Sequence, residues 1–568
     1  MLFLGEWCRQ YDRKAVWSAL DATVAEPYGL DVARKQRDVA YVQALADQLL
    51  IELSAALNAF HGVQHGVRYW NMVLGHWLQR YVAVVFNRYA TLEQAFEKYR
   101  ISGTTVFAAD GYCLAAPESD SFVRSCNDPV WNHVLYANIL RFMARCQLDV
   151  DSQALQGVQG FASAAGKPAT APKRGLRHKA VDAATGMLRR FYRNSDAVIS
   201  GSTLPLPVEA KLQLRLGQVP QLWPSPGLRR VELDRERRKQ FVLNTSETAG
   251  LKAFLRAQLP DMIPVCYLEG YSQLVRDAEA LPWPANPKFI FTSVRFGADE
   301  LFKAWAAAKV EQLGTPYYVG QHGNNYGTHI YAGNAKWPER VTSDRFFSWG
   351  WSEEGTNTVP AIIFREAGRE PERYDPVGGL LLIEKCNPPM IWPWDRYAEF
   401  GRYQEEQFGF VESLPPNVRS ALTVRLHYEH SGYRWFEDQR WRDRCPDVRL
   451  EKGVARLRDM IAQSRLVVHS YDSTGFLETL IANVPSICFT QDTFELAPDA
   501  QPAYQMLRDA GLLVESPQQA AQAVEQHWDN VEAWWNGPTV QNARLAFCAR
   551  YARMTEDPIS TMKELLTA

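Results

Sequence analysis

Hydrophobic residues recur at helical spacing through most of the first 145 positions. Segments 38–61, 67–99 and 129–147 carry apolar side chains three or four positions apart, which is typical of amphipathic helices. The short apolar run 104–110 interrupts this series and is typical of a buried strand, here ending on Asp110. The opening part of the chain is therefore predicted to be mainly helical.

From about residue 196 the pattern changes to short apolar runs separated by amphipathic stretches. The first of these runs are 196–200, 288–293 and 316–323. After residue 374 the alternation restarts, with apolar runs at 379–385, 421–427, 465–471, 485–490 and 511–516. Strands that alternate with helices form parallel sheets covered on both faces. We therefore predict an α/β fold with two facing, doubly wound parallel-sheet domains and further helices after the second sheet.

The restart of the pattern divides the chain at about residue 373. The N-terminal domain, 1–373, is expected to comprise a helical opening to about 150, a basic loop over 151–180 and an α/β part from about 196. The C-terminal domain, 374–545, is expected to hold the second sheet, followed by a terminal helix over 546–568. Ligands of such sheets bind beyond the carboxyl ends of the strands, so the residues after each apolar run are the candidates for a site.

Composition narrows the class of protein. The net charge of −2 argues against a general nucleic-acid binder, and nine scattered cysteines without a CxxC pair suit reduced thiols in the cytoplasm. We find no secretory signal and no apolar window that could span a membrane, so we expect a cytoplasmic protein. The basic segment 173–193, interleaved with aromatic and apolar residues, is either a solvated loop and helix start or a patch that contacts anionic lipid at the inner face of the membrane or a lipid-linked phosphate acceptor.

The apolar run 421–427 ends in polar residues. Arg425 and His427 lie on the face opposite Val424 and Leu426, and a strand buried on both faces would carry apolar residues there. With Glu429 just beyond, they are placed either at a ligand cleft or at an exposed sheet edge. His427 and His430 do not predict a metal site, because no further ligand follows at metal-site spacing.

The run 465–471 leads into a predicted helix through polar residues. Ser473, Thr474 and Gly475 stand at the helix start, where free backbone N–H groups and the helix dipole favour a phosphate. Glu478 lies four positions after Thr474, on the same helix face, and is placed to hold ribose hydroxyls beyond the phosphate. The alternative is an ordinary capped helix with Glu478 in solvent.

A third polar cluster follows the run 316–323, in the other predicted domain. Its members are neutral hydrogen-bonding groups and glycines suited to sugar hydroxyls, or else an ordinary turn: Gln321, His322, Gly323, Asn324 and Asn325. The chain contains no Walker A, GxGxxG or GxSxG motif, which argues against NTPase, dinucleotide-binding and serine-hydrolase functions.

Several motifs resemble a family of transferases encoded in bacterial O-antigen and surface-polysaccharide loci. These are LGEWC, RYWNMVLGHWL, QHGNNYG, SDRFFSWGW and VVHSYDSTGFLETLIANVPSICF, so the resemblance extends over nearly the whole chain. The C-terminal part is similar more broadly to GT-B glycosyltransferases, among them capsule Kdo transferases, bacterial sialyltransferases and CDP-glycerol glycerophosphotransferases. The resemblance implies a GT-B-like fold and a nucleotide-linked donor.

The same resemblance bears on the donor nucleotide. CMP-sugar enzymes of this group carry a His-Pro motif after one strand and a Ser-Ser/Thr motif at a helix start. Ser473-Thr474 matches the second motif, whereas His427 matches the first with Tyr428 in place of proline. This departure leaves CMP, UDP, GDP and CDP donors open.

The leading hypothesis is a GT-B glycosyltransferase that transfers a sugar, such as Kdo, from a nucleotide donor to a glycan or lipid-linked acceptor of surface polysaccharide (O-antigen, lipopolysaccharide or capsule). Arg425 and His427 would stabilise the departing phosphate, so we expect no metal and no cofactor besides the donor substrate. Candidates for the catalytic base or nucleophile are Asp110, Glu269 and His322. The alternatives are a CDP-glycerol-type polyol-phosphate transferase and a non-catalytic scaffold of a polysaccharide assembly complex.

Overall fold

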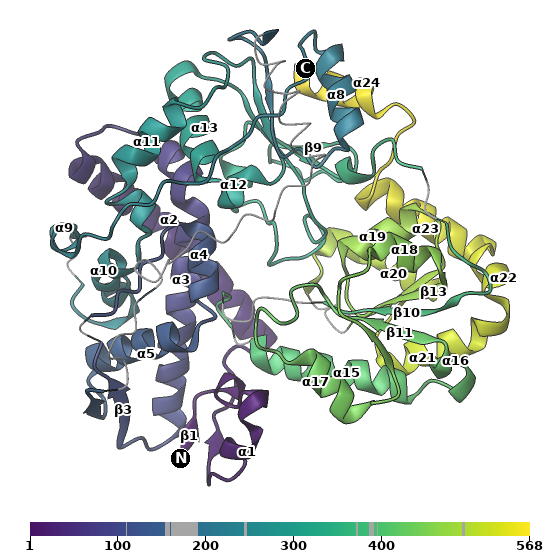
Figure 1. Cartoon of the computed structure of the whole chain (residues 1–568), viewed down its shortest axis with the longest axis horizontal. Coiled ribbons are helices and arrows are strands. Elements are labelled where there is room, and N and C mark those ends of the chain that lie inside the picture. The colour runs from purple at the N-terminus through teal and green to yellow at the C-terminus, as the bar shows by residue number, and fades with distance from the viewer. Residues whose placement is uncertain are drawn as a thin grey trace.

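The computed structural model describes residues 1–109, 111–153, 160, 191–243, 247–370, 373–385, 391–394, 396–490 and 495–568, with the backbone alone for 396–398. Asp110 and all but the last three residues of the basic segment 173–193 lie outside the described residues. Figure 1 shows two α/β parts side by side, with the helical N-terminal region packed on the first of them.

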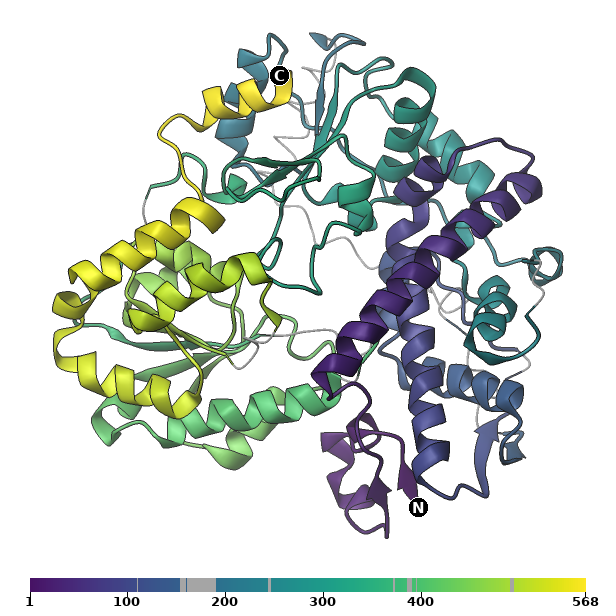
Figure 2. The ribbon, with the colours of Figure 1, turned by 180° about the vertical axis from the view of Figure 1, so that it is seen from behind.

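Two long helices form the frame of the N-terminal region (Figure 2). They are α2 (Val32–His61) and α3 (Val67–Lys98), which pack along each other. Asp31 caps α2 by accepting a hydrogen bond from the backbone N–H of Arg34, and Gly62 ends it in a left-handed conformation at φ 67°. α3 is buried on almost every side, and α5 (Pro129–Met143) packs on it. The prediction of a mainly helical opening is confirmed.

The run 104–110 forms β3 (Gly103–Phe107), which pairs in parallel with β4 (Gln147–Asp151). The predicted strand exists, but three of its five residues are exposed, because β3 and β4 form a small sheet of their own. The prediction that this strand is buried is therefore wrong. The other short elements before the first large sheet are β1 (Leu2–Phe3), α1 (Lys14–Trp17), β2 (Thr23–Val24) and α4 (Ser119–Ser125).

The first large sheet has five parallel strands in chain order. They are β5 (Val198–Ile199), β6 (Ile290–Thr292), β7 (Tyr317–Gly320), β8 (Arg345–Ser348) and β9 (Thr358–Pro360). The helix α13 (Glu300–Leu313) packs between this sheet's other helices and α3, which joins the sheet to the N-terminal region. The helices that accompany the sheet are α8 (Leu206–Arg215), α9 (Arg235–Lys239), α10 (Gly250–Met262), α11 (Tyr271–Glu279), α12 (Arg295–Ala298) and α14 (Pro338–Val341).

The second large sheet has six parallel strands in the order β12-β11-β10-β13-β14-β15. Their bounds are β10 (Gly379–Ile383), β11 (Leu422–Arg425), β12 (Arg449–Glu451), β13 (Ser464–His469), β14 (Ser486–Phe489) and β15 (Leu513–Val514). In order of appearance this is 3-2-1-4-5-6, so the strand order reverses between β10 and β13, where ligands of such sheets bind. The prediction of two parallel sheets in an α/β fold is confirmed; the second sheet is doubly wound, whereas the first keeps its strands in chain order.

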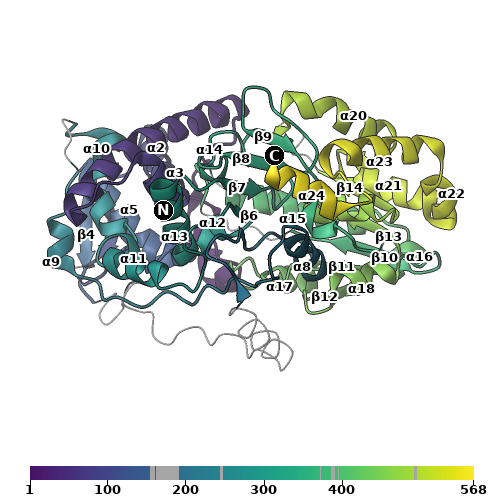
Figure 3. The same ribbon diagram turned by 90° about the horizontal axis from the view of Figure 1, so that it is seen from above.

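Helices cover both faces of the second sheet. They are α15 (Arg396–Glu412), α16 (Pro416–Ser420), α17 (Glu437–Arg444), α18 (Leu457–Ala462), α19 (Thr474–Ile481), α20 (Gln501–Asp509), α21 (Pro517–His527) and α22 (Val531–Trp535). α23 (Pro538–Tyr551) packs on α19 and α20, and the chain then returns to the first α/β part, where α24 (Pro558–Thr567) packs on α8. Figure 3 shows this return from above. None of the described helices is long and apolar enough to cross a membrane.

Candidate functional site

Loops from both sheets line one cavity of about 380 Å³. Lys385 follows β10, and residues 471–475 follow β13, so this side of the cavity lies at the reversal of strand order. Residues 323–325 and His329 come from the loop that follows β7 of the first sheet. We call this space, with Tyr331, Trp392, Trp394 and Glu495 on its remaining wall, the polar cavity.

The helix α19 begins at the polar cavity. Ser473 is its N-cap, and Ser473 Oγ accepts a hydrogen bond from Phe476 N at 3.1 Å. Thr474 Oγ1 accepts a hydrogen bond from Asn324 N at 3.0 Å, so the helix start is tied to the first sheet's loop. The first N–H groups of a helix lack partners within the helix, and the dipole makes this end positive. The start of α19 can therefore bind an anion.

Lys385 supplies a full positive charge to the same cavity. It follows β10, the strand next to β13, and its backbone N–H donates to the hydroxyl of Tyr403 at 2.8 Å. Lys385 Nζ lies 4.6 Å from the centre of the Tyr403 ring. A lysine beside a helix N-terminus is a combination suited to phosphate.

Asp472 joins the two halves of the cavity. Its carboxylate accepts hydrogen bonds from Asn324 Nδ2 at 2.7 Å and from the hydroxyl of Tyr504, and it lies 3.1 Å from His329 Nε2. Asn324 and His329 belong to the first sheet's loop, whereas Tyr504 belongs to α20. The loops that follow β7 and β13 are therefore held in direct contact.

The loop after β7 divides into two groups of residues. Gly323, Asn324 and Asn325 line the polar cavity. Gln321 is 1 % exposed, and its side chain is used internally: Oε1 accepts from Trp349 N and Trp351 Nε1, and Nε2 donates to Gly323 O. Gln321 thus shapes the loop and does not line the cavity.

His322 lies behind the loop among aromatic side chains. Its ring packs near those of Phe296 and Tyr326, and Nδ1 lies 3.3 Å from the Tyr326 hydroxyl. Burial, together with the nearby cation of Arg365, lowers the pKa of His322 to about 4. His322 is therefore neutral at physiological pH, and it does not line the polar cavity.

Asn325 has the features of a residue held for function. Its φ of 79° is uncommon for a residue with a side chain. Its Oδ1 is buried and has no hydrogen-bond partner among the described residues. Strained backbone and unsatisfied polar atoms cluster at ligand sites. Among the residues predicted to contact the sugar, Asn325 is therefore the strongest candidate for a hydrogen bond to a ligand.

Arg425, His427 and Glu429 are not brought to the start of α19. Arg425 is the last residue of β11 and the other two follow it, and β10 separates β11 from β13. Arg425 Nε lies 3.5 Å from Glu451 Oε2 of β12, on the side of the sheet away from β13. His427 Nδ1 accepts a hydrogen bond from Glu429 N within the same turn. In place of Arg425, Lys385 contributes the positive charge of the polar cavity.

The remaining predicted residues are held by ion pairs. Glu478 Oε1 lies 2.9 Å from Arg365 Nε, a residue of the first α/β part. Glu269 is bound by both Arg238 Nε and Arg238 Nη2, and both side chains are almost fully buried. Neither carboxylate lines the polar cavity. The described residues contain no group of three or more His, Cys, Asp or Glu that would hold a metal ion.

Sequence reasoning missed several residues of the polar cavity. Lys385 ends the apolar run GLLLIEK, and His329 stands in the Asn- and Gly-rich loop, so both carried the strand-end signal used for the other clusters. Trp392 and Trp394 carried only the weaker signal of a short aromatic stretch, IWPW. Asp472 directly precedes Ser473 in the sequence, but its contacts with the first sheet's loop arise from tertiary structure alone.

Several solved structures are similar to this chain. The spinosyn rhamnosyltransferase SpnG, complexed with spinosyn aglycone, has 14% identity over 53% of this chain and 77% of its own, with a TM-score of 0.29. S. aureus MnaA in a co-structure with UDP has 12% identity over 65% and 95%, with a TM-score of 0.34. The wall teichoic acid polymerase TagF has 11% identity over 69% and 95%, with a TM-score of 0.31.

Among curated proteins none matches the chain. A family model covers almost its whole length, and the match extends over residues 1–566. The expectation of a transferase family, based on motifs from the N-terminus to β14, is thereby confirmed. The chain belongs to the LIC12162 family of transferases.

Proposed function

We propose that this transferase is a glycosyltransferase that takes its sugar from a nucleotide donor bound in the polar cavity. One observation carries the proposal: the start of α19 and Lys385 meet at the reversal of strand order in the second sheet, opposite the loop that follows β7. This edge is where doubly wound sheets bind nucleotides. A nucleotide has the anionic phosphate that such a cavity requires.

The phosphate of the donor would lie against the first N–H groups of α19, near Ser473, Thr474 and Gly475. Gly475 lines the cavity and has no side chain, so a ligand can approach its backbone closely. Lys385 and the helix dipole would stabilise the negative charge that grows on the leaving phosphate. The charge is thus balanced by groups of the chain that are already in place.

The sugar of the donor would extend toward the loop that follows β7. Asn324 and Asn325 lie there, and Asn325 Oδ1 has no partner among the described residues. An amide oxygen accepts a hydrogen bond from a sugar hydroxyl. The transferred sugar is therefore assigned to the side of the cavity that the first sheet contributes.

The motifs resemble those of transferases of bacterial surface-polysaccharide loci. We therefore assign as acceptor a glycan or lipid-linked saccharide of such a polysaccharide. The donor is a CMP-, UDP-, GDP- or CDP-linked compound, with a CMP-linked acidic sugar such as Kdo as one candidate. The mass of the product separates a transferred sugar from a transferred polyol phosphate. The reaction is assigned to the cytoplasmic side of the membrane, where nucleotide donors are available.

Calorimetry with CMP, UDP, GDP and CDP tests the proposal. One of the nucleotides is expected to bind, and the double variant Ser473→Ala/Thr474→Ala is expected to lose that binding. The matched control is Ser516→Ala, because Ser516 caps α21 in the same way, by accepting from Gln519 N, away from the polar cavity. Loss of either cap costs about 1 kcal/mol of stability, so only a specific loss of affinity in the double variant supports the site. Unchanged affinity there, or no binding of any nucleotide to the native chain, refutes the proposal.

A further inference from the structure

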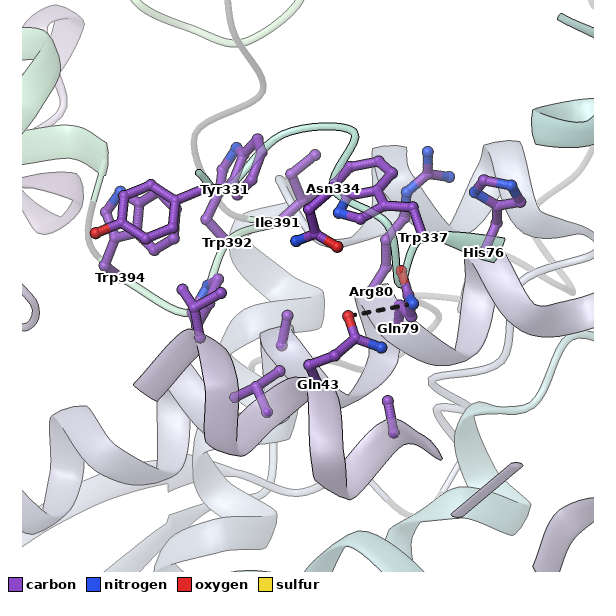
Figure 4. A pocket seen from close by; sticks show the side chains of 15 residues that line it. Gln43, His76, Gln79, Arg80, Tyr331, Asn334, Trp337, Ile391, Trp392 and Trp394 are labelled. Atoms are coloured by element: carbon purple, nitrogen blue, oxygen red, sulfur yellow. Dashed lines mark hydrogen bonds between the residues drawn. The ribbon is translucent and has the colours of Figure 1, made fainter. Parts of the chain in front are cut away.

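A second cavity, of about 270 Å³, lies beside the polar cavity. Figure 4 shows the side chains that line it. Side chains of α2 and α3 form its floor, and Trp337 and residues 391–394 form the opposite wall. We call it the aromatic cavity. Tyr331, Trp392 and Trp394 line both cavities, so the two spaces share a wall. A ligand in the aromatic cavity would therefore end next to the donor assigned to the polar cavity.

The lining of the aromatic cavity suits a saccharide. Aromatic rings offer flat apolar faces against which the C–H face of a sugar ring packs, and a few polar groups fix the orientation of a ligand in such a cavity. Gln43 and Gln79, whose amide groups are 3.4 Å apart, and Asn334 supply neutral donors and acceptors. These groups match sugar hydroxyls.

Two buried polar atoms on the shared wall lack partners. The Tyr331 hydroxyl and Trp394 Nε1 make no hydrogen bond within the described ranges, although their residues are only 6% and 4% exposed. A buried donor without a partner is costly, and native structures rarely contain one without a reason. Hydroxyls of a bound sugar would satisfy both atoms.

The opposite end of the aromatic cavity carries a cation. Figure 4 shows Arg80 and His76 at the end away from Trp394. Arg80 makes no hydrogen bond or ion pair with any residue that the structure describes, and burial lowers its pKa. The nearby carboxylate of Glu339 accepts from Tyr326 at 2.7 Å and lies 3.3 Å from His76 Nε2, so its closest contacts are elsewhere. A guanidinium in this setting is suited to a carboxylate or phosphate.

We infer that the aromatic cavity is the acceptor subsite and that it takes a saccharide bearing an anionic group, a carboxylate or a phosphate, held by Arg80. The inference rests on the proposed function, since it names the acceptor of the same reaction. The sugar packs between the aromatic side chains, its anion lies at the Arg80 end, and a hydroxyl reaches the shared wall. Arg80 is thus a determinant of acceptor specificity.

The test measures direct binding of matched saccharides, without turnover. Glucuronate and glucose 6-phosphate are compared with glucose, and mannose 6-phosphate with mannose, by saturation-transfer NMR and calorimetry on the full chain. We expect at least one anionic sugar to bind about tenfold more tightly than its neutral parent, as one charge-assisted contact implies. Arg80→Gln is expected to remove this preference, Arg80→Lys to retain part of it, and Trp337→Ala to weaken both members of a pair.

The controls separate this inference from the proposed function. Arg141→Gln removes an exposed arginine of α5 and should leave the preference unchanged. Ser473→Ala/Thr474→Ala should abolish nucleotide binding and leave saccharide binding intact, so the two sites can be tested separately. Equal binding of anionic and neutral sugars, an undiminished preference in a folded Arg80→Gln variant, or no saccharide binding by the native chain overturns the inference. Nucleotide binding that persists alongside such a result leaves the donor site standing.

Discussion

Asn324 Nδ2 donates a 2.7 Å hydrogen bond to Asp472 Oδ1, and this contact joins the loop after β7 to the loop after β13. The two residues are 148 positions apart in the chain and belong to different sheets. His329 approaches the same carboxylate, so the contact is a small network around one acid. The polar cavity exists because these loops meet.

Replacing Asn324 by Ala is expected to loosen the contact between the two α/β parts. A hydrogen bond to a carboxylate contributes about 1.5–3 kcal/mol, and this one acts only while the loops are together. Small-angle X-ray scattering should show a larger radius of gyration for Asn324→Ala than for the native chain. The control is Asn138→Ala, which removes a 3.0 Å bond to Gln258 inside the N-terminal half. An equal radius in all three proteins contradicts the prediction.

Glu269→Gln is expected to destabilise the chain. Glu269 and Arg238 are 3% and 4% exposed, and removal of the carboxylate leaves a buried, unpaired guanidinium, which costs about 3–5 kcal/mol. Thermal unfolding measures the loss. The double variant Glu269→Leu/Arg238→Met should recover much of it, and Glu236→Gln, in the exposed pair with Lys239, should have little effect. A variant that keeps its melting temperature and loses transfer activity would instead support Glu269 as the catalytic base.

The strands of the sheets were easier to predict from the sequence than the residues of the polar cavity. β10 and β13 were predictable because they contain the continuous apolar runs LLLI and LVV, as strands buried on both faces require. β12 was missed, because three residues of an edge strand, RLE, carry no such pattern. The cap of α19 was predictable from the order Asp-Ser-Thr-Gly, since capping is a local property.

The order of the strands within the second sheet could not be predicted from the sequence. Arg425 lies at the end of one apolar run and Ser473 just beyond another, and only the strand order places β10 between β11 and β13 and so keeps Arg425 away from α19. Lys385 became part of the site for the same reason. Local patterns identify the ends of strands, whereas which ends are neighbours depends on tertiary packing.

Because two carboxyl groups are buried, we predict that the free energy of unfolding falls as pH rises. Glu384 follows β10 and accepts from Trp441 Nε1, and Glu437 begins α17. Burial raises the pKa of Glu384, and burial with the neighbouring Glu384 raises the pKa of Glu437. Above about pH 4.3, the ordinary Glu pKa, the folded chain therefore holds more protons than the unfolded chain, and stability is lost as pH rises toward the raised values.

Glu437→Gln should flatten this dependence. The melting temperature of the native chain is expected to fall between about pH 5 and about pH 8, and the variant should be more stable than the native chain at the higher pH, because the amide has no proton to lose. Glu525→Gln on the exposed face of α21 is the control and should follow the native curve. Parallel curves for native chain and Glu437→Gln would show that this carboxyl is ionised in the folded state.

Substitution of Glu478 distinguishes two possible roles of this residue: an ion pair between the two α/β parts, and a contact with the ribose of the donor. Its carboxylate lies 2.9 Å from Arg365 Nε and does not line the polar cavity, so Glu478→Gln is expected to leave discrimination between ribose and 2′-deoxyribose unchanged. Calorimetry with the nucleotide that binds and with its 2′-deoxy form gives the ratio of affinities. Glu478→Gln and Arg365→Gln should each lower the free energy of unfolding by at most about 1 kcal/mol, because the ion pair is partly exposed. The double variant should lower it little further, because either change alone breaks the same pair. A ratio that collapses in Glu478→Gln alone would place the ribose on this carboxylate.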